Sequence, residues 1–235
     1  MYVGTQVAPR NQTDLEVWSQ LGVNNICTDP FTEDSKGNYK SINPHKWTVE
    51  ILEKHIEKLK KFGLNLDIVQ IPLSSRPLEE SQSPNIMLGK SPERDKEIDS
   101  ILNILSMCSK VGIPCVKYNM NIIGIPRSIS EKGRGGSTNS TFRWNKINQE
   151  EKPGIAGILD PDTNWERIDY FLSKVVPVAE ELKVRLACHP HDPYTPDGYK
   201  GINRVLGTVD GLKKFVELNE SPYHGLNFCQ GTITE

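Results

Sequence analysis

Strand and helix patterns alternate along the whole of this chain. A short apolar run typical of a β-strand is followed by a longer segment with helical periodicity, and the pair recurs roughly every 40 residues. We expect strands at residues 2–6, 23–28, 64–73 and 115–123, then one ending at His189 and one ending at Cys229. The first expected helix begins near Thr13, and the others cover residues 48–62, 93–110, 164–182 and 209–219. Because consecutive parallel strands need a crossover connection, this alternation predicts a parallel sheet covered by helices.

The connections between these elements are asymmetric. The turns from helix to strand are short and contain Gly22, Gly63 and Gly112, whereas the segments after strands are long and polar, notably residues 74–92 and 125–160. In a parallel α/β barrel this places every elaborated loop where the strands end, which is where such proteins keep their active sites. Six strands are two fewer than a closed barrel needs. We therefore expect a single, incomplete barrel domain over residues 1–235, with exposed first and last strands, that is poorly behaved alone.

The composition limits which kinds of molecule the protein is expected to bind. The formal net charge is -2 and the pI is about 6.2, which gives no basic surface for nucleic acid or for an anionic membrane. Five cysteines form no CxxC pair, so neither a disulfide framework nor a zinc ribbon is indicated. No apolar run approaches the roughly 18 residues of a membrane span, and the first residues lack a signal-peptide pattern. These features predict a cytoplasmic protein with a small-molecule ligand and a possible homo-oligomeric state.

Two segments near the end of the chain carry side chains that bind metals. Residues 184–189 alternate in polarity and end in His189, and the apolar positions of residues 226–228 lead into Cys229. Imidazole and thiolate at the ends of two successive strands suit a divalent transition metal. The alternative is that both side chains are buried structural groups. Cys188 must point away from His189, so it is expected to pack against a helix.

The same segments resemble a known family. Residues 189–193 (His-Pro-His-Asp-Pro), 201–204 (Gly-Ile-Asn-Arg) and 225–232 (Gly-Leu-Asn-Phe-Cys-Gln-Gly-Thr) are similar to segments of the mannonate dehydratase family, which read approximately His-Pro-Asp-Asp-Pro, Gly-x-x-Arg and Gly-Leu-x-x-Cys-x-Gly. The resemblance begins near Arg94. Residues 120–127 lack the family's Trp-Thr-Arg-Thr run, and residues 132–138 are similar to a divergent branch of sugar isomerase-like barrel proteins.

The resemblance implies a (β/α)₈ TIM barrel of the xylose isomerase-like type, with about six of its eight strand–helix units present. It also implies a hydro-lyase of carbohydrate metabolism that converts D-mannonate into 2-dehydro-3-deoxy-D-gluconate, a reaction of hexuronate degradation. The family uses a divalent metal, usually Mn²⁺. Its His and Cys ligands correspond to His189 and Cys229, while its remaining ligands, a His and an Asp, and a catalytic Tyr lie on later strands that this sequence does not include.

Four further residues are candidates for the reaction. His191 and Asp192 follow His189 on the same loop and could act as acid–base groups, although an exposed loop histidine is a common alternative for His191. Asn119, near the end of a strand, is expected to face the barrel interior and bind a substrate hydroxyl. Arg134 lies between glycines and could bind a sugar-acid carboxylate in a bidentate manner, the alternative being a mobile basic loop without a fixed contact.

Two other functions compete with the dehydratase. A sugar isomerase or epimerase on the same barrel usually presents Glu on its fourth strand and Asp and His on the next two, whereas this chain presents no Glu there and then His and Cys. An inactive, truncated member that only binds a ligand is the third possibility. The sequence favours the dehydratase and leaves open whether the natural chain continues past Glu235.

Overall fold

The computed structural model describes residues 2–234 and contains one large parallel sheet. Its six strands lie in the order β1-β2-β5-β6-β9-β10, and every pairing between neighbours is parallel. The strands are β1 (Gly4–Thr5), β2 (Asn25–Cys27), β5 (Asn65–Gln70), β6 (Cys115–Asn119), β9 (Arg185–His189) and β10 (His224–Leu226). All six expected strands are therefore present and adjacent in chain order.

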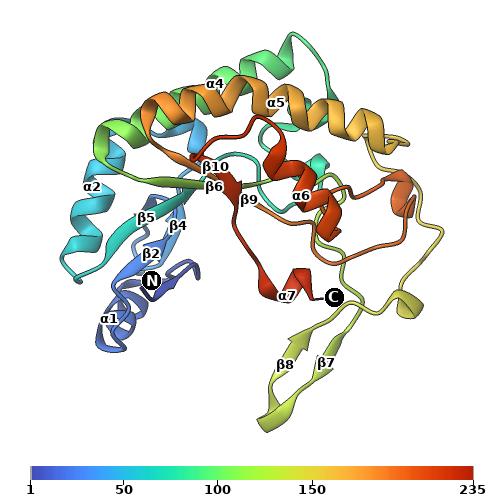
Figure 1. The fold of residues 1–235 in the computed structure, drawn as a ribbon. Coiled ribbons are helices and arrows are strands. Elements are labelled where there is room, and N and C mark those ends of the chain that lie inside the picture. Colours follow the sequence, from blue (N-terminus) through green and yellow to red (C-terminus); the bar gives the residue numbers. More distant parts are fainter. Residues whose placement is uncertain (1, 235) are drawn as a thin grey trace.

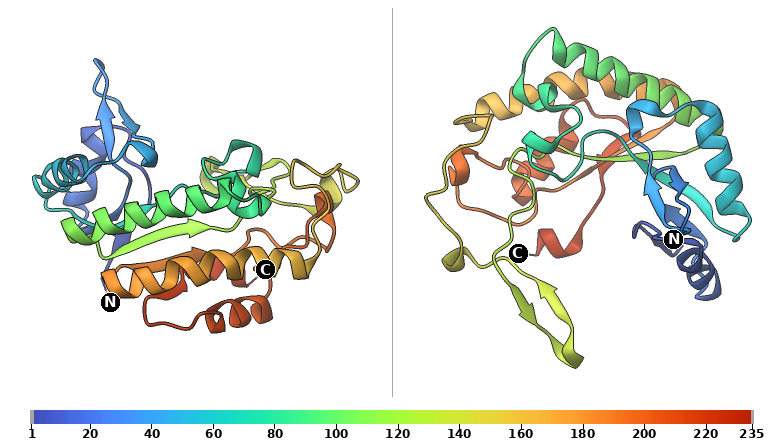
Figure 2. Two further views of the ribbon diagram at one scale, coloured as in Figure 1. Left: turned by 90° about the horizontal axis from the view of Figure 1, so that it is seen from above. Right: turned by 180° about the vertical axis from the view of Figure 1, so that it is seen from behind.

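Helices follow these strands. They are α1 (Gln12–Gln20), α2 (Val49–Lys60), α3 (Pro84–Leu88), α4 (Glu93–Val111), α5 (Pro161–Leu182), α6 (Val209–Glu217) and α7 (Gln230–Ile233). The longer ones cover one face of the sheet (Figure 1). Figure 1 shows α2, α4 and α5 arching over the outer face, and the two turned views agree (Figure 2). The sheet and its helices thus form six strand–helix units of a (β/α) barrel, as expected from the alternation. None of the helices in the described part of the chain has the length and apolarity needed to cross a membrane.

Local signals explain where the helices begin and end. The Thr48 side chain accepts a hydrogen bond from the backbone N–H of Ile51 at 3.2 Å, which caps the start of α2. Gly112, with φ of 79°, ends α4 in the left-handed conformation that glycine adopts without strain. The cap of α1 differs from the expectation near Thr13: Asn11 caps this helix by accepting from the N–H of Asp14.

The core lies between the sheet and the helices. On α2, Leu52, His55 and Leu59 form a buried stripe at helical spacing, and α4 contributes a longer one. Val116 and Tyr118 of β6 are completely buried beneath this helix layer, and the Tyr118 ring packs on Phe171 of α5 with centroids 5.6 Å apart. On the opposite, inner face, β6 and β9 present polar side chains that include Lys117, Asn119 and His189.

Two short hairpins were not expected from the sequence. Strands β3 (Phe31–Glu33) and β4 (Tyr39–Ser41) form one within the segment after β2. Strands β7 (Ser130–Lys132) and β8 (Thr138–Ser140) form the other inside the long loop after β6. The second hairpin projects from the body of the molecule (Figures 1 and 2). Its strands consist almost wholly of polar residues, so they lack the apolar alternation by which strands are identified in a sequence.

Candidate active site

The last residues of β6 and β9 share one face of the sheet. Tyr118 pairs with Cys188 and Asn119 pairs with His189 in the parallel register. Tyr118 and Cys188 are both completely buried on the helix side. Because side chains alternate along a strand, Asn119 and His189 point to the inner face, where the strands end. The expected orientations of Asn119, His189 and Cys188 therefore agree with the register.

The ring of His189 is oriented by its own loop. Its Nδ1 lies 2.7 Å from the carbonyl oxygen of Pro190. Since a carbonyl only accepts, Nδ1 must carry the proton, and this leaves the Nε2 lone pair available. This tautomer, held by a backbone carbonyl, is the one that metal-binding histidines use.

Cys229 lies beyond its strand and not at its last position. Strand β10 ends at Leu226, three residues earlier than expected, and Cys229 is the residue that precedes α7. The hydroxyl of Thr232 donates to the sulfur of Cys229 at 3.2 Å. Since β9 and β10 are parallel neighbours, His189 and Cys229 follow the same end of adjacent strands. A pocket of about 270 Å³ between the two segments is lined by Pro190 on one side and Thr232 on the other.

The described residues contain no cluster of three or more His, Cys, Asp or Glu side chains arranged to hold a metal ion. His189 and Cys229 are the metal-capable pair that the strand ends provide. Their chemistry fits a divalent transition metal, because an imidazole with a free Nε2 and a thiol that accepts a hydrogen bond are both suitable donors.

The structure assigns His191 a structural role and not the acid–base role expected from the sequence. Its side chain is 2% exposed, and both ring nitrogens are occupied: Nε2 donates to the carbonyl of Met120 at 3.2 Å, and Nδ1 accepts from the N–H of Leu206 at 3.3 Å. Burial lowers the pKa of His191 to about 3, so the ring is neutral. A ring that is enclosed and fully bonded to backbone has no free nitrogen to offer to a substrate.

Asp192 remains the candidate acid–base group on this loop. Its side chain is 20% exposed, and its Oδ2 accepts a hydrogen bond from Arg127 at 3.1 Å. Arg127 follows β6, so the ion pair joins the loop after β6 to the loop after β9.

The buried Arg204 connects the same two loops from beneath. Its guanidinium donates to the carbonyl oxygens of Pro193 at 2.6 Å, Asp192 at 3.1 Å and Gly124 at 3.1 Å, and to Oδ1 of Asn121 at 3.2 Å. A planar guanidinium can satisfy several acceptors at once, which explains why an arginine and not a lysine suits this position. Arg204 thereby fixes the backbone that presents Asp192.

Arg134 lies away from these groups. It is exposed at the tip of the β7–β8 hairpin, in the short helical turn Arg134–Gly136. Because this hairpin projects from the body (Figure 1), the expected carboxylate-binding role of Arg134 has no support in this structure. The glycines around it form the hairpin turn: Gly135 and Gly136 have positive φ angles.

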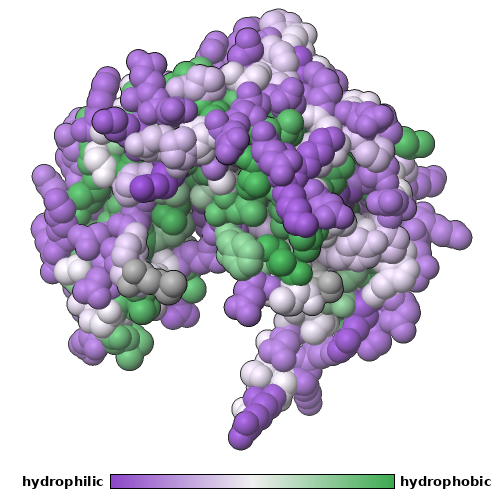
Figure 3. Space-filling view, in the orientation of Figure 1, coloured by the Kyte–Doolittle hydropathy of each residue, from purple (hydrophilic) through white to green (hydrophobic). Residues whose placement is uncertain are grey.

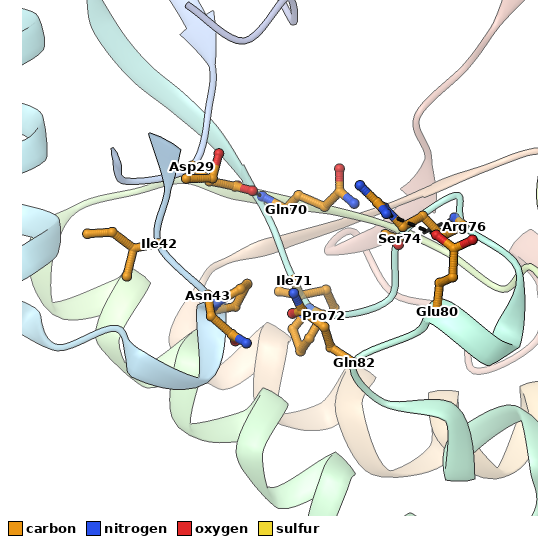
Figure 4. Close-up of a pocket in the computed structure, with 12 residues that line it drawn as sticks. Asp29, Ile42, Asn43, Gln70, Ile71, Pro72, Ser74, Arg76, Glu80 and Gln82 are labelled. Carbon is orange, nitrogen blue, oxygen red and sulfur yellow. Dashed lines mark hydrogen bonds and ion pairs between the residues drawn. The ribbon is translucent and has the colours of Figure 1, made fainter. Parts of the chain in front are cut away.

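A second cavity opens at the ends of β2 and β5. It measures about 410 Å³, and Asp29, Gln70, Ser74 and Arg76 are among its polar lining residues (Figure 4). Asp29 accepts the backbone N–H of Gln70 at 2.8 Å, and burial raises the pKa of its carboxyl against the opposing effects of that hydrogen bond and of Lys117. The space-filling view is hollowed on the open side of the sheet (Figure 3).

Comparisons with known proteins point to one family. The model of the D-mannonate dehydratase family matches residues 155–235. The mannonate dehydratase of Endomicrobium trichonymphae is 28% identical over 219 residues, and the alignment covers 80% of this chain and 57% of that protein. Mannonate dehydratase 2 of Halalkalibacterium halodurans is 28% identical over 211 residues, with 80% and 58% covered. This chain is similar to mannonate dehydratases over most of its length. It spans less than two thirds of the length of these curated relatives.

Solved structures show the same fold. The crystal structure of mannonate dehydratase from Streptococcus suis serotype 2 superposes with a TM-score of 0.79 at 23% sequence identity, covering 100% of this chain and 64% of that one. A xylose isomerase domain protein from Planctomyces limnophilus gives a TM-score of 0.52 at 15% identity, with 96% and 62% covered. The fold is therefore of the xylose isomerase-like TIM-barrel type, as the resemblance implied.

The sequence did not single out Asp29, which lines the second cavity, or Arg127, which pairs with Asp192. Asp29 directly follows an expected strand, so its position at a strand end was a usable signal. Arg127 follows β6 at a distance of several residues, and only the folded loop brings it to Asp192.

Proposed function

We propose that the protein is a metal-dependent hydro-lyase that removes water from a sugar acid, D-mannonate giving 2-dehydro-3-deoxy-D-gluconate. The observation that carries this proposal is the side-by-side placement of Asn119 and His189 on the inner face where β6 and β9 end, in a chain similar to mannonate dehydratases. This is the end of a parallel barrel at which ligands bind.

His189 and Cys229 are the residues proposed to hold the metal, through Nε2 and the sulfur. When bound, a divalent ion such as Mn²⁺ supplies positive charge that stabilises the negative charge developing beside the substrate carboxylate. The Nδ1–H of His189 donates a hydrogen bond to the carbonyl oxygen of Pro190, so Nε2 is available to bind the metal.

The other residues of the site bind and exchange protons. The Asn119 side-chain amide can both donate to and accept from a substrate hydroxyl. Asp192, paired with Arg127, can accept a proton from the carbon beside the substrate carboxylate. The polar cavity lined by Asp29 and Gln70 supports a polyhydroxylated ligand, because its amide and carboxyl groups can bond to hydroxyls.

The metal assignment is tested with His189→Ala and Cys229→Ser. Mn²⁺ binding, followed by electron paramagnetic resonance, should weaken by about tenfold or more in each variant, because each loses a ligand. His45→Ala is the matched control: this exposed histidine bonds to Ser100 and Gln82 and should bind Mn²⁺ as the wild type does. Equal Mn²⁺ affinity in all four proteins would contradict the assignment.

The reaction is tested by incubating the protein and the same variants with Mn²⁺ and D-mannonate or related aldonates, and measuring the 2-keto product. These 235 residues alone should show little or no activity, because the further metal ligands and the catalytic Tyr that the resemblance implies are not among them. In a form that includes those residues, both ligand substitutions should abolish activity and His45→Ala should retain it. Interconversion of ketoses without dehydration would instead identify a sugar isomerase or epimerase.

A further inference from the structure

A groove separate from the Asp29 cavity lies between the base of the β7–β8 hairpin and the loop after β9. It measures about 540 Å³, which is within the usual range for small-molecule sites, and is lined by Arg127, Ser140, Phe142, Trp144, Asp192, Pro193, Tyr194 and Pro196. Asp192 is three residues after His189, so the loop that follows the proposed metal ligand forms one side of the groove.

The Arg127 guanidinium lines this groove and uses only some of its hydrogen-bond donors. Arg127 is 37% exposed and donates to two acceptors, the carbonyl of Pro126 at 3.0 Å and Oδ2 of Asp192 at 3.1 Å. A guanidinium has five N–H donors in a planar fork, so these two bonds leave donors for a second carboxylate. Asp192 holds one part of the fork and thereby orients the rest.

Its wall is aromatic. The Trp144 ring packs edge-on against Tyr199 at a centroid distance of 5.2 Å, and Phe142 lies 6.5 Å from Trp144. Tyr194, 51% exposed, adds another ring to the lining. Such rings offer rigid apolar surface to the C–H groups of a sugar, while their polar edges remain accessible to water.

We propose that this groove is the binding site for the carboxylate end of a sugar acid, with Arg127 bonding the carboxylate and Trp144 packing against the carbon chain. The inference rests on the proposed function for the identity of the ligand and deepens it by naming a specificity-determining residue. It gives Arg127 the task that the sequence suggested for Arg134. The two arginines differ in setting: Arg127 lies in the groove beside Asp192, and Arg134 is exposed on the hairpin tip.

The test measures binding without metal, so that it is independent of catalysis. D-mannonate and its uncharged counterpart D-mannitol are titrated into the protein in the presence of a chelator, by calorimetry and by tryptophan fluorescence. Arg127→Met should raise the Kd for D-mannonate about 10- to 150-fold, the range for losing charged hydrogen bonds, and leave the Kd for D-mannitol unchanged. Arg127→Lys should retain part of the affinity, because it keeps the charge and loses the fork.

Two further variants complete the design. Arg134→Met is the matched control and should bind both ligands as the wild type does. Trp144→Ala should weaken binding of both ligands, because the ring contacts carbon and not the carboxylate. Circular dichroism verifies that each variant is folded.

Failure of this proposal and failure of the proposed function are distinguishable. Wild-type protein that does not bind D-mannonate, or Arg127→Met that binds it normally, overturns the groove assignment even if dehydration is observed. Binding that depends on Arg127, without dehydration even by a form that includes the implied further ligands, supports the groove and contradicts the hydro-lyase.

Discussion

Neighbouring histidines in this chain have opposite chemical settings. His189 ends β9 on the inner face with one nitrogen bonded, whereas His191 is enclosed with both nitrogens bonded to backbone. The sequence motif contains both and cannot separate them, because the difference arises from Met120 and Leu206, which are distant in sequence. Alternation along the strand predicts the direction of His189, but nothing local predicts the partners of His191.

A third histidine, His55, should make the stability of the fold depend on pH. His55 of α2 is 5% exposed, its Nε2 has no hydrogen-bond partner among the described residues, and burial lowers its pKa to about 4. His55 therefore becomes protonated near pH 6.5 in the unfolded chain but only near pH 4 in the folded protein. The stability associated with the neutral ring is present above pH 6.5 and is lost as the pH falls through this window.

We predict that the free energy of unfolding, measured with urea, decreases between pH 7 and pH 4. His55 should contribute up to about 1.4 kcal/mol of this decrease per pH unit. His55→Leu should remove that contribution and give a flatter profile. His45→Leu is the control, because His45 is exposed and should keep the wild-type slope. Parallel profiles for wild type and His55→Leu would show that His55 is not the cause.

At the scale of elements, the helices and the order of the strands could be predicted, and the hairpins could not. Helix ends were marked by Thr48 and by glycines such as Gly112, which act through local backbone geometry. The predicted last strand extended to Cys229, whereas β10 ends at Leu226. The apolar run into Phe228 continues the strand pattern in the sequence, although the chain turns toward α7 there. The position of Arg134 depends on the β7–β8 hairpin, whose polar strands give no signal.

The β7–β8 hairpin should be dispensable for folding. Ser130 pairs with Ser140 at its base, and beyond that pair the side-chain interactions are surface contacts such as the Glu131–Arg143 ion pair. Joining Ser130 to Ser140 with Asn-Gly, a sequence suited to a two-residue turn, removes the tip with Arg134. Thermal unfolding should shift by less than about 4 °C, because exposed ion pairs contribute little.

Binding of D-mannonate by the shortened protein should also be unchanged, since Arg127 and Trp144 remain. A large loss of stability would show that the hairpin tip packs on the body of the molecule. A loss of binding with stability intact would restore a ligand-binding role for Arg134.

For the molecule as a whole, the sheet has two edges. Strands β1 and β10 each have one parallel neighbour within residues 2–234, so one side of each presents unpaired backbone groups. Apolar side chains beside both edges are exposed: Val3 is 70% exposed and Phe228 is 65% exposed. Exposed strands flanked by apolar side chains favour association between copies of a chain.

We predict that a polypeptide of these 235 residues self-associates, as the count of strands in the sequence also suggests. Sedimentation velocity should show a mean mass that rises with concentration, and Val3→Lys combined with Phe228→Lys should lower that mass at equal concentration, because a charge opposes edge-to-edge pairing. Ile158→Lys is the matched control: this side chain is 84% exposed but lies in the segment before α5, away from both edge strands in sequence, so the charge should have no effect there. A monodisperse monomer at all concentrations would mean that the edges are protected within the chain itself.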